Sequence, residues 1–452
     1  MERERLGSRL GFILLSAGCA IGLGNIWKFP YMVGEYGGGA FVLVYLVFLA
    51  ILGIPVLCME LSIGRGSRSS PLKMFGKLQP EGSKWNLQGY ACMAGTYLLM
   101  AFYVVVTAWL LIYMFQTMTG MFAGLDAEGV SDAFDATAAD PVLCLGVVAV
   151  VTVLGFTVCS LGVQNGLERV TKPLMILMLV IMVFLAGYAL TMPGAMKGLE
   201  FYLVPDFDRM MDNGIWNVIV AAMSQAFFTL SLGIGSMAIF GSYASDDRSM
   251  LGESARIASV DLFVAFTAGL IIFPACFAYG VEVDAGPSLI FETLPNIFID
   301  MPYGEVVGTF FFLFMFFAAV STVFAVFEAI VANVMELTGW DRKKTCIVNC
   351  IVMFLLIVPC ALGFGILSGI QPMGPGSTIM DLEDFIVSFL LLPIGALIGV
   401  LFCTSRKGWG WDGFKAEANK GEGAKIRDWM RPYMTYVIPL VIIAILVVGL
   451  LS

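Results

Sequence analysis

Two short runs of glycine and hydrogen-bonding residues carry most of the chemistry in this sequence. They are residues 17–25 (AGCAIGLGN) and residues 228–235 (FTLSLGIG), and each has Gly-x-Gly inside an apolar stretch, with Asn25, Thr229 and Ser231 nearby. A helix interrupted there would free amides that suit a carboxylate and carbonyls that suit an ammonium group or Na⁺. These runs therefore point to a binding site for small charged groups.

Catalytic chemistry has little support. The chain has no histidine, which removes His-based triads, His-ligated metals and the usual proton shuttle. Its ten cysteines, such as Cys19, Cys58 and Cys92, lie mostly in apolar runs without CxxC pairs. They are interpreted as small buried side chains rather than as disulfides or metal ligands. We expect the protein not to be an enzyme.

The elements that must position these runs are membrane helices. Of the 452 residues, 59% are hydrophobic and only 13% are charged, with a mean hydropathy of +0.90, which excludes a soluble fold. About 20 apolar residues make one helical crossing. Eleven stretches qualify, at about 10–33, 40–63, 88–122, 142–161, 167–192, 214–241, 256–281, 304–337, 346–367, 382–404 and 433–451.

The charges predict an orientation and exclude one class of partner. With a cytoplasmic N-terminus, all of the 25 Lys and Arg except Lys28, Lys197 and Arg209 fall in inside segments, as the positive-inside rule requires. A net charge of −9 argues against a nucleic-acid partner. We expect a multi-pass protein of the plasma membrane whose partners are the lipid bilayer and a small molecule.

The two Gly-x-Gly runs occur in the first and sixth apolar stretches. One such run alone favours helix packing, but a matched pair with polar neighbours favours two broken helices that line a site. Their spacing predicts an inverted repeat, with one half at about 10–192, the other at about 214–404 and an extra helix at about 433–451. All of it forms a single transmembrane domain, 1–452.

Longer motifs extend this pattern: residues 17–30 (AGCAIGLGNIWKFP), 35–41 (EYGGGAF) and 225–235 (QAFFTLSLGIG). With them the chain resembles the neurotransmitter:sodium symporters, in particular bacterial amino-acid members related to the leucine transporter. The resemblance implies an all-α polytopic membrane protein with a 5+5 inverted repeat, broken helices 1 and 6, and eleven transmembrane helices. It also implies sodium-coupled symport of a neutral, hydrophobic L-amino acid by alternating access.

The resemblance also implies binding sites for two co-transported Na⁺ ions and for the substrate. The first sodium site would use Ala20, Asn25, Thr229 and Asp261, where Asp261 replaces the Asn of many members. The second would use Gly18, Ile21, Ala318, Ser321 and Thr322. Because Gly22 stands where monoamine carriers have Asp, the substrate should bring its own carboxylate. The implied substrate-binding residues are Ala20, Leu23, Gly24, Leu99, Tyr103, Phe228, Thr229, Ser231, Ile234, Thr322 and Val326.

Gates follow from the same resemblance. Lys28 and Asp384 would pair on the outer side, above a lid of Phe228 and Tyr103. The inner gate would use Arg3, Glu336 and Tyr243. In the fifth helix, Gly166 and Pro173 resemble the family's helix-unwinding pair, although a plain proline kink is an equal interpretation.

Transport is expected to be independent of chloride. Tyr45 and Gln225 match chloride-binding positions of the family, but Ala265 replaces its Ser. The Asp261 carboxylate, one turn away, would repel a second anion at low dielectric. During a return without Na⁺ a buried Asp261 favours protonation, so H⁺ countertransport is a further expectation.

Three alternatives stay open at this point: a channel, an intramembrane protease, and a polytopic protein without transport. A protease would need a second aspartate facing Asp261, and only Glu60 and Glu328 are candidates. The particular amino acid and the oligomeric state stay open as well.

Overall fold

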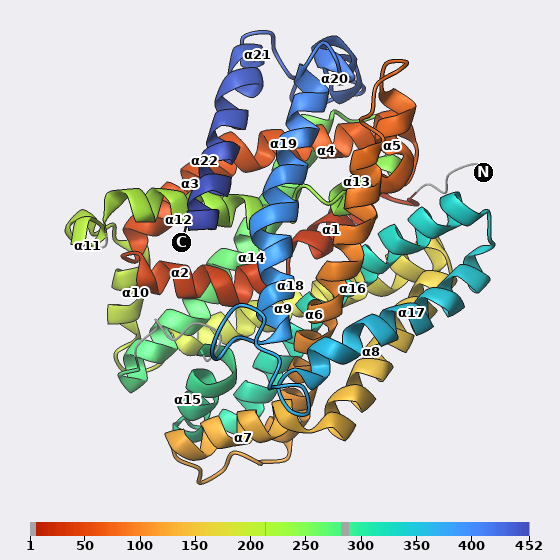
Figure 1. Cartoon of the computed structure of the whole chain (residues 1–452). Coiled ribbons are helices and arrows are strands. Elements are labelled where there is room, and N and C mark those ends of the chain that lie inside the picture. Colours follow the sequence, from red (N-terminus) through yellow and green to blue (C-terminus); the bar gives the residue numbers. More distant parts are fainter. Residues whose placement is uncertain (1–5, 213, 282–288, 452) are drawn as a thin grey trace.

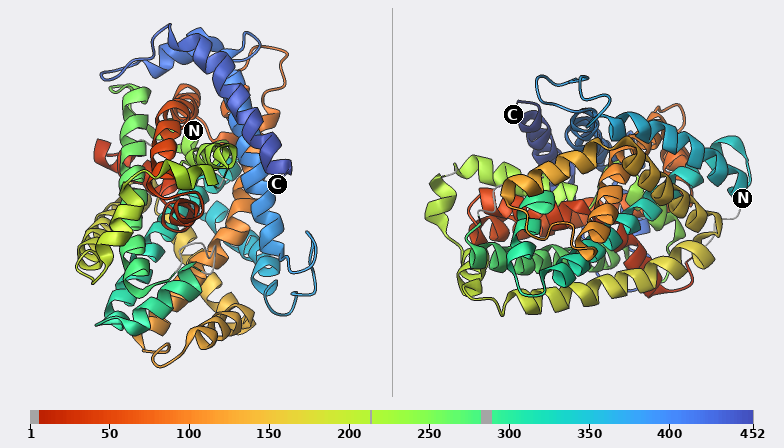
Figure 2. Two further views of the ribbon diagram at one scale, coloured as in Figure 1. Left: turned by 90° about the vertical axis from the view of Figure 1, so that its left-hand side faces the viewer. Right: turned by 90° about the horizontal axis from the view of Figure 1, so that it is seen from below.

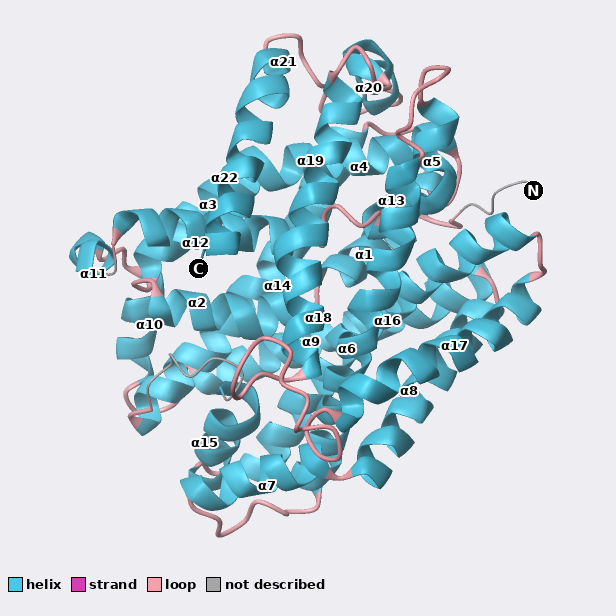
Figure 3. Ribbon diagram, in the orientation of Figure 1, coloured by secondary structure: helices cyan, strands magenta, loops and turns pink. Residues whose placement is uncertain are grey.

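The chain folds into a bundle of helices joined by short loops (Figure 3). The computed structural model describes residues 6–212, 214–281 and 289–451. Within them, two isolated β-bridges, Gly38 with Pro205 and Arg248 with Glu422, add to the helices. The predicted all-α class is confirmed.

Nine helices in the described part of the chain are long and apolar enough to cross a membrane, and a bent pair forms a tenth crossing. The remaining predicted crossing, at about 214–241, corresponds to the shorter apolar helix α12 and to α13, which a break separates. The eleventh crossing therefore stays a prediction. In chain order, spans 1 to 11 are α1 (Arg9–Ala20) with η1–α2 (Gly24–Glu35), α3–α4 (Gly39–Ser67), α6 (Leu87–Met118), α8 (Pro141–Ser160), η3–α9 (Val163–Ala189), α12 (Ile215–Phe228) with α13 (Ser236–Tyr243), α14 (Met250–Tyr279), α16 (Gly304–Thr338), α17 (Arg342–Leu362), α18–α19 (Ile379–Thr404) and α21–α22 (Met430–Leu450).

Span 1 is broken after Ala20, as predicted, and its halves are bent by 61°. A Cβ atom at Gly22 would lie 2.4 Å from the Tyr103 hydroxyl oxygen, so the backbone passes where no side chain fits. The break leaves carbonyls near the end of α1 without helical partners. It therefore creates acceptors in the middle of the bundle.

Span 6 is broken between Phe228 and Ser236. Gly233 and Gly235 have φ of +110° and +76°, a conformation that side chains disfavour, and Ser231 adopts φ of 50°. A Cβ atom at Gly233 would lie 2.1 Å from the Leu392 carbonyl oxygen. The second predicted interruption is thus confirmed, and glycine is needed there for both conformation and space.

The broken spans 1 and 6 lie inside the bundle, whereas the last two spans, 10 and 11, lie at its periphery. Helix α16 packs along α6 and against α1, and α13 packs against α4. Spans 3 and 8 are the most buried of the nine continuous helices, whereas span 11 is the least buried. Figure 2 shows α19 and α22 side by side at the periphery. The two helix breaks are consequently shielded from lipid.

Short helices cover the two ends of the bundle (Figure 1). At one end lie α5 (Pro71–Leu78) and α20 (Gly410–Ala418), and at the other α7 (Ala127–Ala139) and α15 (Leu294–Asp300). The loop at 282–303 contains Pro287, Pro295 and Pro302, which predict a folded segment rather than a floppy connection. Helix α15 confirms this for the described part, whereas Pro287 lies outside the described residues. Two further short helices are α10 (Ala195–Leu203) and α11 (Phe207–Asp212).

The segment 405–431 is rich in Lys, Gly and Trp, which indicates a linker, and it is anchored to the bundle. The buried Arg65 guanidinium, at the end of span 2, pairs with Glu417 of α20 at 2.7 Å. Arg248, in the loop after span 6, pairs with Glu422 at 2.9 Å. Tertiary ion pairs therefore order a stretch whose Gly- and Lys-rich sequence indicated flexibility.

Span 5 begins with the π-helical turn η3 (Val163–Glu168) rather than with an unwound stretch at Gly166. Gly162, with φ of +92°, starts this turn. A Cβ atom at Gly166 would lie 2.1 Å from the Val158 carbonyl oxygen, so Gly166 serves close packing. Pro173 lies inside α9. The expected unwinding at Gly166 is therefore not present in this conformation.

Candidate functional site

Five oxygen atoms from spans 1 and 8 meet beside the break in span 1. The Ser321 hydroxyl lies 3.0 Å from the Gly18 carbonyl oxygen and 2.8 Å from that of Ala318. The Thr322 hydroxyl lies 3.1 Å from the carbonyl oxygens of both Gly18 and Ile21. We call these five residues the α1–α16 oxygen cluster. They are the five proposed for the second sodium site.

A second group surrounds the carboxylate of Asp261, which is fully buried in span 7. The Asn25 side-chain amide donates to Asp261 Oδ1 at 2.8 Å and to the Thr229 hydroxyl at 3.0 Å. Thr229 in turn donates to Asp261 Oδ2 at 3.0 Å. Ala20, the remaining residue proposed for the first sodium site, ends α1 close by in sequence and is also buried. We call these four residues the Asp261 cluster.

Both clusters have the composition of sites for a small, hard cation. Their atoms are carbonyl, hydroxyl and carboxylate oxygens, which such cations prefer. No Lys or Arg in the described part of the chain forms an ion pair with Asp261. A buried carboxylate is costly unless a positive charge compensates it. A bound cation would supply that charge.

The hydrogen-bond partners of Asp261 also bear on the protease alternative. Its carboxylate contacts an amide and a hydroxyl, and among the described residues no second carboxylate hydrogen-bonds with it. A protease of the aspartyl type needs two carboxylates that share a proton. The geometry thus argues against that activity.

Groups that could hold a substrate lie between the two clusters. The Leu23 amide donates to the Tyr103 hydroxyl oxygen at 3.3 Å, so two of the proposed carboxylate partners already meet. The Gly22 amide donates to Asn25 Oδ1 at 3.2 Å. Gly24 lies against Phe228, because a Cβ atom there would be 2.9 Å from the Phe228 ring.

The remaining proposed pocket residues come from the same elements. Leu99 lies one turn before Tyr103 on α6, and Val326 lies one turn after Thr322 on α16. Ser231 and Ile234 belong to the break in span 6, and Ile234 and Val326 are almost completely buried. No proposed residue of this pocket carries a charged side chain. The structure therefore brings the proposed apolar lining to the helix breaks.

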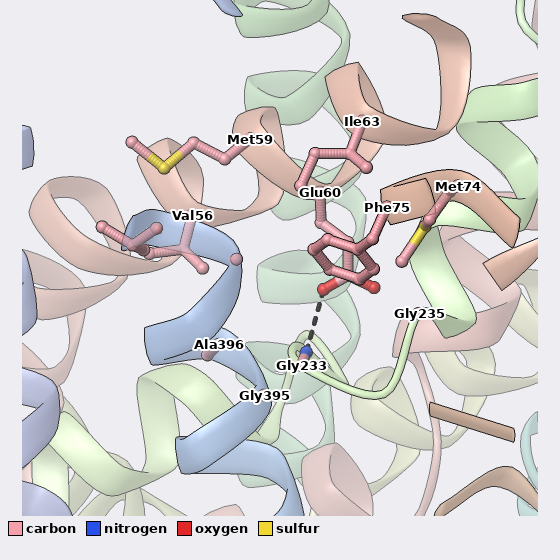
Figure 4. A pocket seen from close by; sticks show the side chains of 12 residues that line it. Val56, Met59, Glu60, Ile63, Met74, Phe75, Gly233, Gly235, Gly395 and Ala396 are labelled. Atoms are coloured by element: carbon pink, nitrogen blue, oxygen red, sulfur yellow. Dashed lines mark hydrogen bonds between the residues drawn. The ribbon is translucent and has the colours of Figure 1, made fainter. Parts of the chain in front are cut away.

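Glu60 of span 2 is a functional candidate that the sequence analysis did not assign. Its carboxylate accepts a hydrogen bond from the Gly233 amide at 2.9 Å (Figure 4). It also accepts one from the Met237 amide at 3.2 Å. A negative charge at the start of α13 is favourable because of the helix dipole. A cavity of about 20 Å³ adjoins these residues. The signal was available, since an ionisable residue inside a membrane helix commonly marks function.

The proposed outer gate residues do not form an ion pair in the described structure. The Lys28 ammonium lies 3.9 Å from the centroid of the Phe228 ring and 6.0 Å from that of Phe389. Asp384 accepts a hydrogen bond from Ser388 at 2.7 Å. Lys28 therefore contacts the lid residue Phe228 in this conformation, and its pairing with Asp384 stays a prediction.

Tyr243, proposed for the inner gate, belongs to a buried network that the sequence analysis did not assign. Its hydroxyl donates to Glu328 at 2.7 Å. The Arg342 guanidinium holds the same carboxylate with two bonds, of 2.7 and 3.0 Å. This network joins spans 6, 8 and 9 near the inner end of the bundle.

The other two inner-gate residues are Glu336, which contacts the start of α5, and Arg3. Glu336 accepts hydrogen bonds from the Ser70 amide at 3.0 Å and the Ser70 hydroxyl at 2.8 Å. It thereby joins the inner end of span 8 to the start of α5. Arg3 lies outside the described residues, so its predicted contact is not placed.

The residues matched to chloride binding also lie near the Asp261 cluster. The Gln225 side-chain amide donates to the Gly24 carbonyl at 2.8 Å, next to Asn25. Tyr45 and Ala265 are fully buried, and Ala265 follows Asp261 by one turn of α14. The Asp261 carboxylate thus lies in the same part of the structure as the residues matched to chloride binding.

Comparisons with known proteins agree with this geometry. The sequence model of the Sodium:neurotransmitter symporter family matches residues 3–128 and 142–452. The uncharacterized sodium-dependent transporter YhdH of Bacillus subtilis is 36% identical over 87% of this chain and 86% of its own length. An uncharacterized sodium-dependent transporter of Methanocaldococcus jannaschii is 31% identical over 98% of this chain and 90% of its own length.

A solved structure shares the whole fold. The crystal structure of MhsT in complex with L-phenylalanine superimposes with a TM-score of 0.86 at 38% identity, and covers 99% of this chain and 100% of MhsT. The broken spans, the buried oxygen clusters and these matches have one explanation. The chain is a sodium-dependent transporter and belongs to the sodium:neurotransmitter symporter family.

Proposed function

We propose that this protein takes up a neutral, hydrophobic L-amino acid together with two Na⁺ ions by alternating access. The observation that carries the proposal is the pair of buried oxygen clusters beside the two helix breaks. MhsT, the similar transporter, was solved with L-phenylalanine, which supports a hydrophobic amino-acid substrate here.

One Na⁺ would bind in each cluster. In the Asp261 cluster the carboxylate would neutralise the ion. The α1–α16 oxygen cluster is neutral, and its five oxygens include two carbonyls from the inner half of span 1. Sodium in this cluster would hold α1 against α16. Release of that ion would then free α1 to move, which links ion binding to opening.

The substrate carboxylate would bind the Leu23 and Gly24 amides and the Tyr103 hydroxyl. In the substrate-bound state it would displace the direct contact between Leu23 and Tyr103. The amine would bind the carbonyls of Ala20, Phe228 and Thr229, assisted by Ser231. A side chain would lie among Leu99, Tyr103, Phe228, Ile234, Thr322 and Val326, where a charge would be left unpaired at a cost of several kcal/mol.

Alternation would proceed between the Lys28–Asp384 outer gate and an inner gate that includes Arg3, Glu336 and Tyr243. The positive-inside pattern supports a cytoplasmic N-terminus in the plasma membrane. Transport would not need chloride because Asp261 supplies the negative charge. H⁺ countertransport is a natural extension, since a proton could replace Na⁺ on Asp261 during the return.

An uptake screen in proteoliposomes tests this function. We expect saturable uptake of one or more hydrophobic L-amino acids when an inward Na⁺ gradient is applied. Uptake should disappear when K⁺ replaces Na⁺ on both sides of the membrane. Equal uptake in K⁺ would exclude sodium coupling, and uptake that does not saturate would favour a channel.

Replacement of Tyr103 by Phe should weaken substrate binding by about 1 to 3 kcal/mol, a factor of roughly 5 to 150 in Kd. The reason is the loss of a hydroxyl that donates to the substrate carboxylate. Binding of the labelled substrate to purified protein measures the change. Tyr113→Phe is the matched control, because Tyr113 lies on the same helix within an aromatic cluster. Equal affinities for Tyr103→Phe and the native protein would show that the carboxylate binds elsewhere.

A further inference from the structure

The cytoplasmic end of span 1 is attached to span 5 through one carboxylate. Glu168 Oε2 accepts the Gly7 amide at 2.8 Å, and Oε1 accepts the Ser8 hydroxyl at 2.8 Å. Lys172, one turn further along span 5, donates to Ser8 Oγ at 2.6 Å and to Glu168 Oε1 at 2.5 Å. Ser8 also caps α1 by accepting the Gly11 amide at 3.0 Å. We call these contacts the Glu168 latch.

The position of this carboxylate is favourable for the start of a helix. It lies beside the N-terminus of α1, where unpaired amides and the helix dipole attract negative charge. Here the charge comes from another span rather than from α1 itself. Glu168 is 5% exposed, whereas Gly7 is exposed and Ser8 and Lys172 are half-buried, so the latch lies at the edge of the bundle with its carboxylate turned inward.

Glycine makes the contact possible. A Cβ atom at Gly11 would lie 2.2 Å from Glu168 Oε1 and 2.5 Å from its carboxyl carbon. An alanine at Gly11 would therefore push the Glu168 side chain out of its place. Position 11 gives a way to disturb the latch from span 1 without changing the carboxylate.

The geometry of span 5 determines where Glu168 points. Glu168 is the last residue of the π-helical turn η3 (Val163–Glu168). A π-helical turn contains one residue more than a regular turn, and each residue rotates an α-helix by about 100°. Conversion of this turn into a regular one would rotate Glu168 away from α1. The latch and the shape of span 5 are thus coupled.

The latch is connected to the α1–α16 oxygen cluster through a rigid element. Helix α1 runs without interruption from Arg9 to Ala20, and Gly18 near its end contributes a carbonyl to the cluster. A swing of α1 away from span 5 would carry that carbonyl away from Ser321 and Thr322. On its other side α1 is held by the ion pair of Arg9 with Glu253 in span 7, at 2.9 Å.

We propose that Glu168 is a positioning residue of the transport cycle, which keeps the inner half of span 1 closed on span 5 until Na⁺ leaves the α1–α16 oxygen cluster. This inference rests on the proposed function for its place in the cycle. The contact between spans 1 and 5 can nevertheless be tested without transport.

Alkylation of Cys19 provides the readout. Cys19 lies on α1 and is fully buried, with its sulfur 3.8 Å from the Ser236 carbonyl oxygen. Purified native protein and the variants Glu168→Ala, Glu168→Gln and Gly11→Ala are treated with a small maleimide in the presence of Na⁺ and without substrate. Mass spectrometry then gives the rate at Cys19 alone. We expect Glu168→Ala and Gly11→Ala to increase it by about 10-fold to 100-fold, because bonds to a charged group are lost.

Two further measurements separate a latch from general destabilisation. Gly187→Ala is the matched control. Gly187 lies in span 5 like Glu168, and a Cβ atom there would meet nothing within 4 Å. It should label like the native protein. In Glu168→Gln, which fills the same volume, the Na⁺ concentration for half-maximal substrate binding should rise by about 10-fold while the melting temperature changes little.

Native labelling rates at Cys19 in both Glu168→Ala and Gly11→Ala would overturn the latch. So would an equal increase in Gly187→Ala, because that increase would show a nonspecific loosening. If the native protein shows no sodium-dependent uptake, that result would contradict the proposed function and not the latch. The labelling result would still decide whether Glu168 holds span 1.

Discussion

Replacement of Asp261 by Asn should reduce uptake in chloride-free medium by about 100-fold or more. The variant removes the single carboxylate of the Asp261 cluster but keeps its size and one acceptor oxygen, which can still accept the hydrogen bond from Asn25. Removal of one member of a buried charge pair typically costs about 3 to 5 kcal/mol, which corresponds to such a factor. Uptake in proteoliposomes containing sodium gluconate measures the effect.

The same experiment tests independence from chloride. The native protein should transport equally well in sodium chloride and in sodium gluconate, because the carboxylate replaces the anion. For Asp261→Asn, chloride should either restore part of the uptake or leave it abolished. Asp208→Asn, an exposed residue of α11, is the control for loss of a carboxylate. If the native protein stops in gluconate, the role given to Asp261 is wrong.

The double variant Ser321→Ala, Thr322→Val should raise the Na⁺ concentration needed for substrate binding by about 100-fold. Each hydroxyl that is removed would bind the Na⁺ ion, and a bond to a charged group contributes about 1.5 to 3 kcal/mol. The variant keeps the side-chain volumes close to native and retains the carbonyl groups of Gly18 and Ala318. Titration of substrate binding with Na⁺ measures the change.

Two controls make this result specific. Thr322→Ser keeps a hydroxyl and should behave nearly like the native protein. Thr309→Ala removes a hydroxyl at the exposed outer end of the same helix, where it bonds the Glu305 carbonyl at 2.6 Å. A native Na⁺ dependence in the double variant would show that no coupled ion binds between α1 and α16.

Much of the fold is determined by local sequence. Membrane crossings follow from about 20 consecutive apolar residues, and the two breaks follow from Gly-x-Gly runs. Glycine is needed for space at Gly22 and for a positive φ at Gly233 and Gly235.

Some residues of one site are also close in sequence. Ser321 and Thr322 are adjacent, and Gly18 and Ile21 lie one turn apart. The resemblance to a family indicated which of these residues belong to one site. The structure places Ser321 and Thr322 within hydrogen-bond distance of Gly18 and Ile21.

Contacts between distant spans were decided by the tertiary structure. The sequence showed that Glu60, Glu168 and Glu328 are ionisable groups within apolar stretches, but not that they bind the backbone of span 6, the start of span 1 and Arg342. The resemblance also paired Lys28 with Asp384, whereas in this conformation the Lys28 ammonium lies over the Phe228 ring. Hydrophobic periodicity specifies which residues face inward, but a buried charge has several candidate partners. Only the packing of spans at their final angles and depths selects one of them.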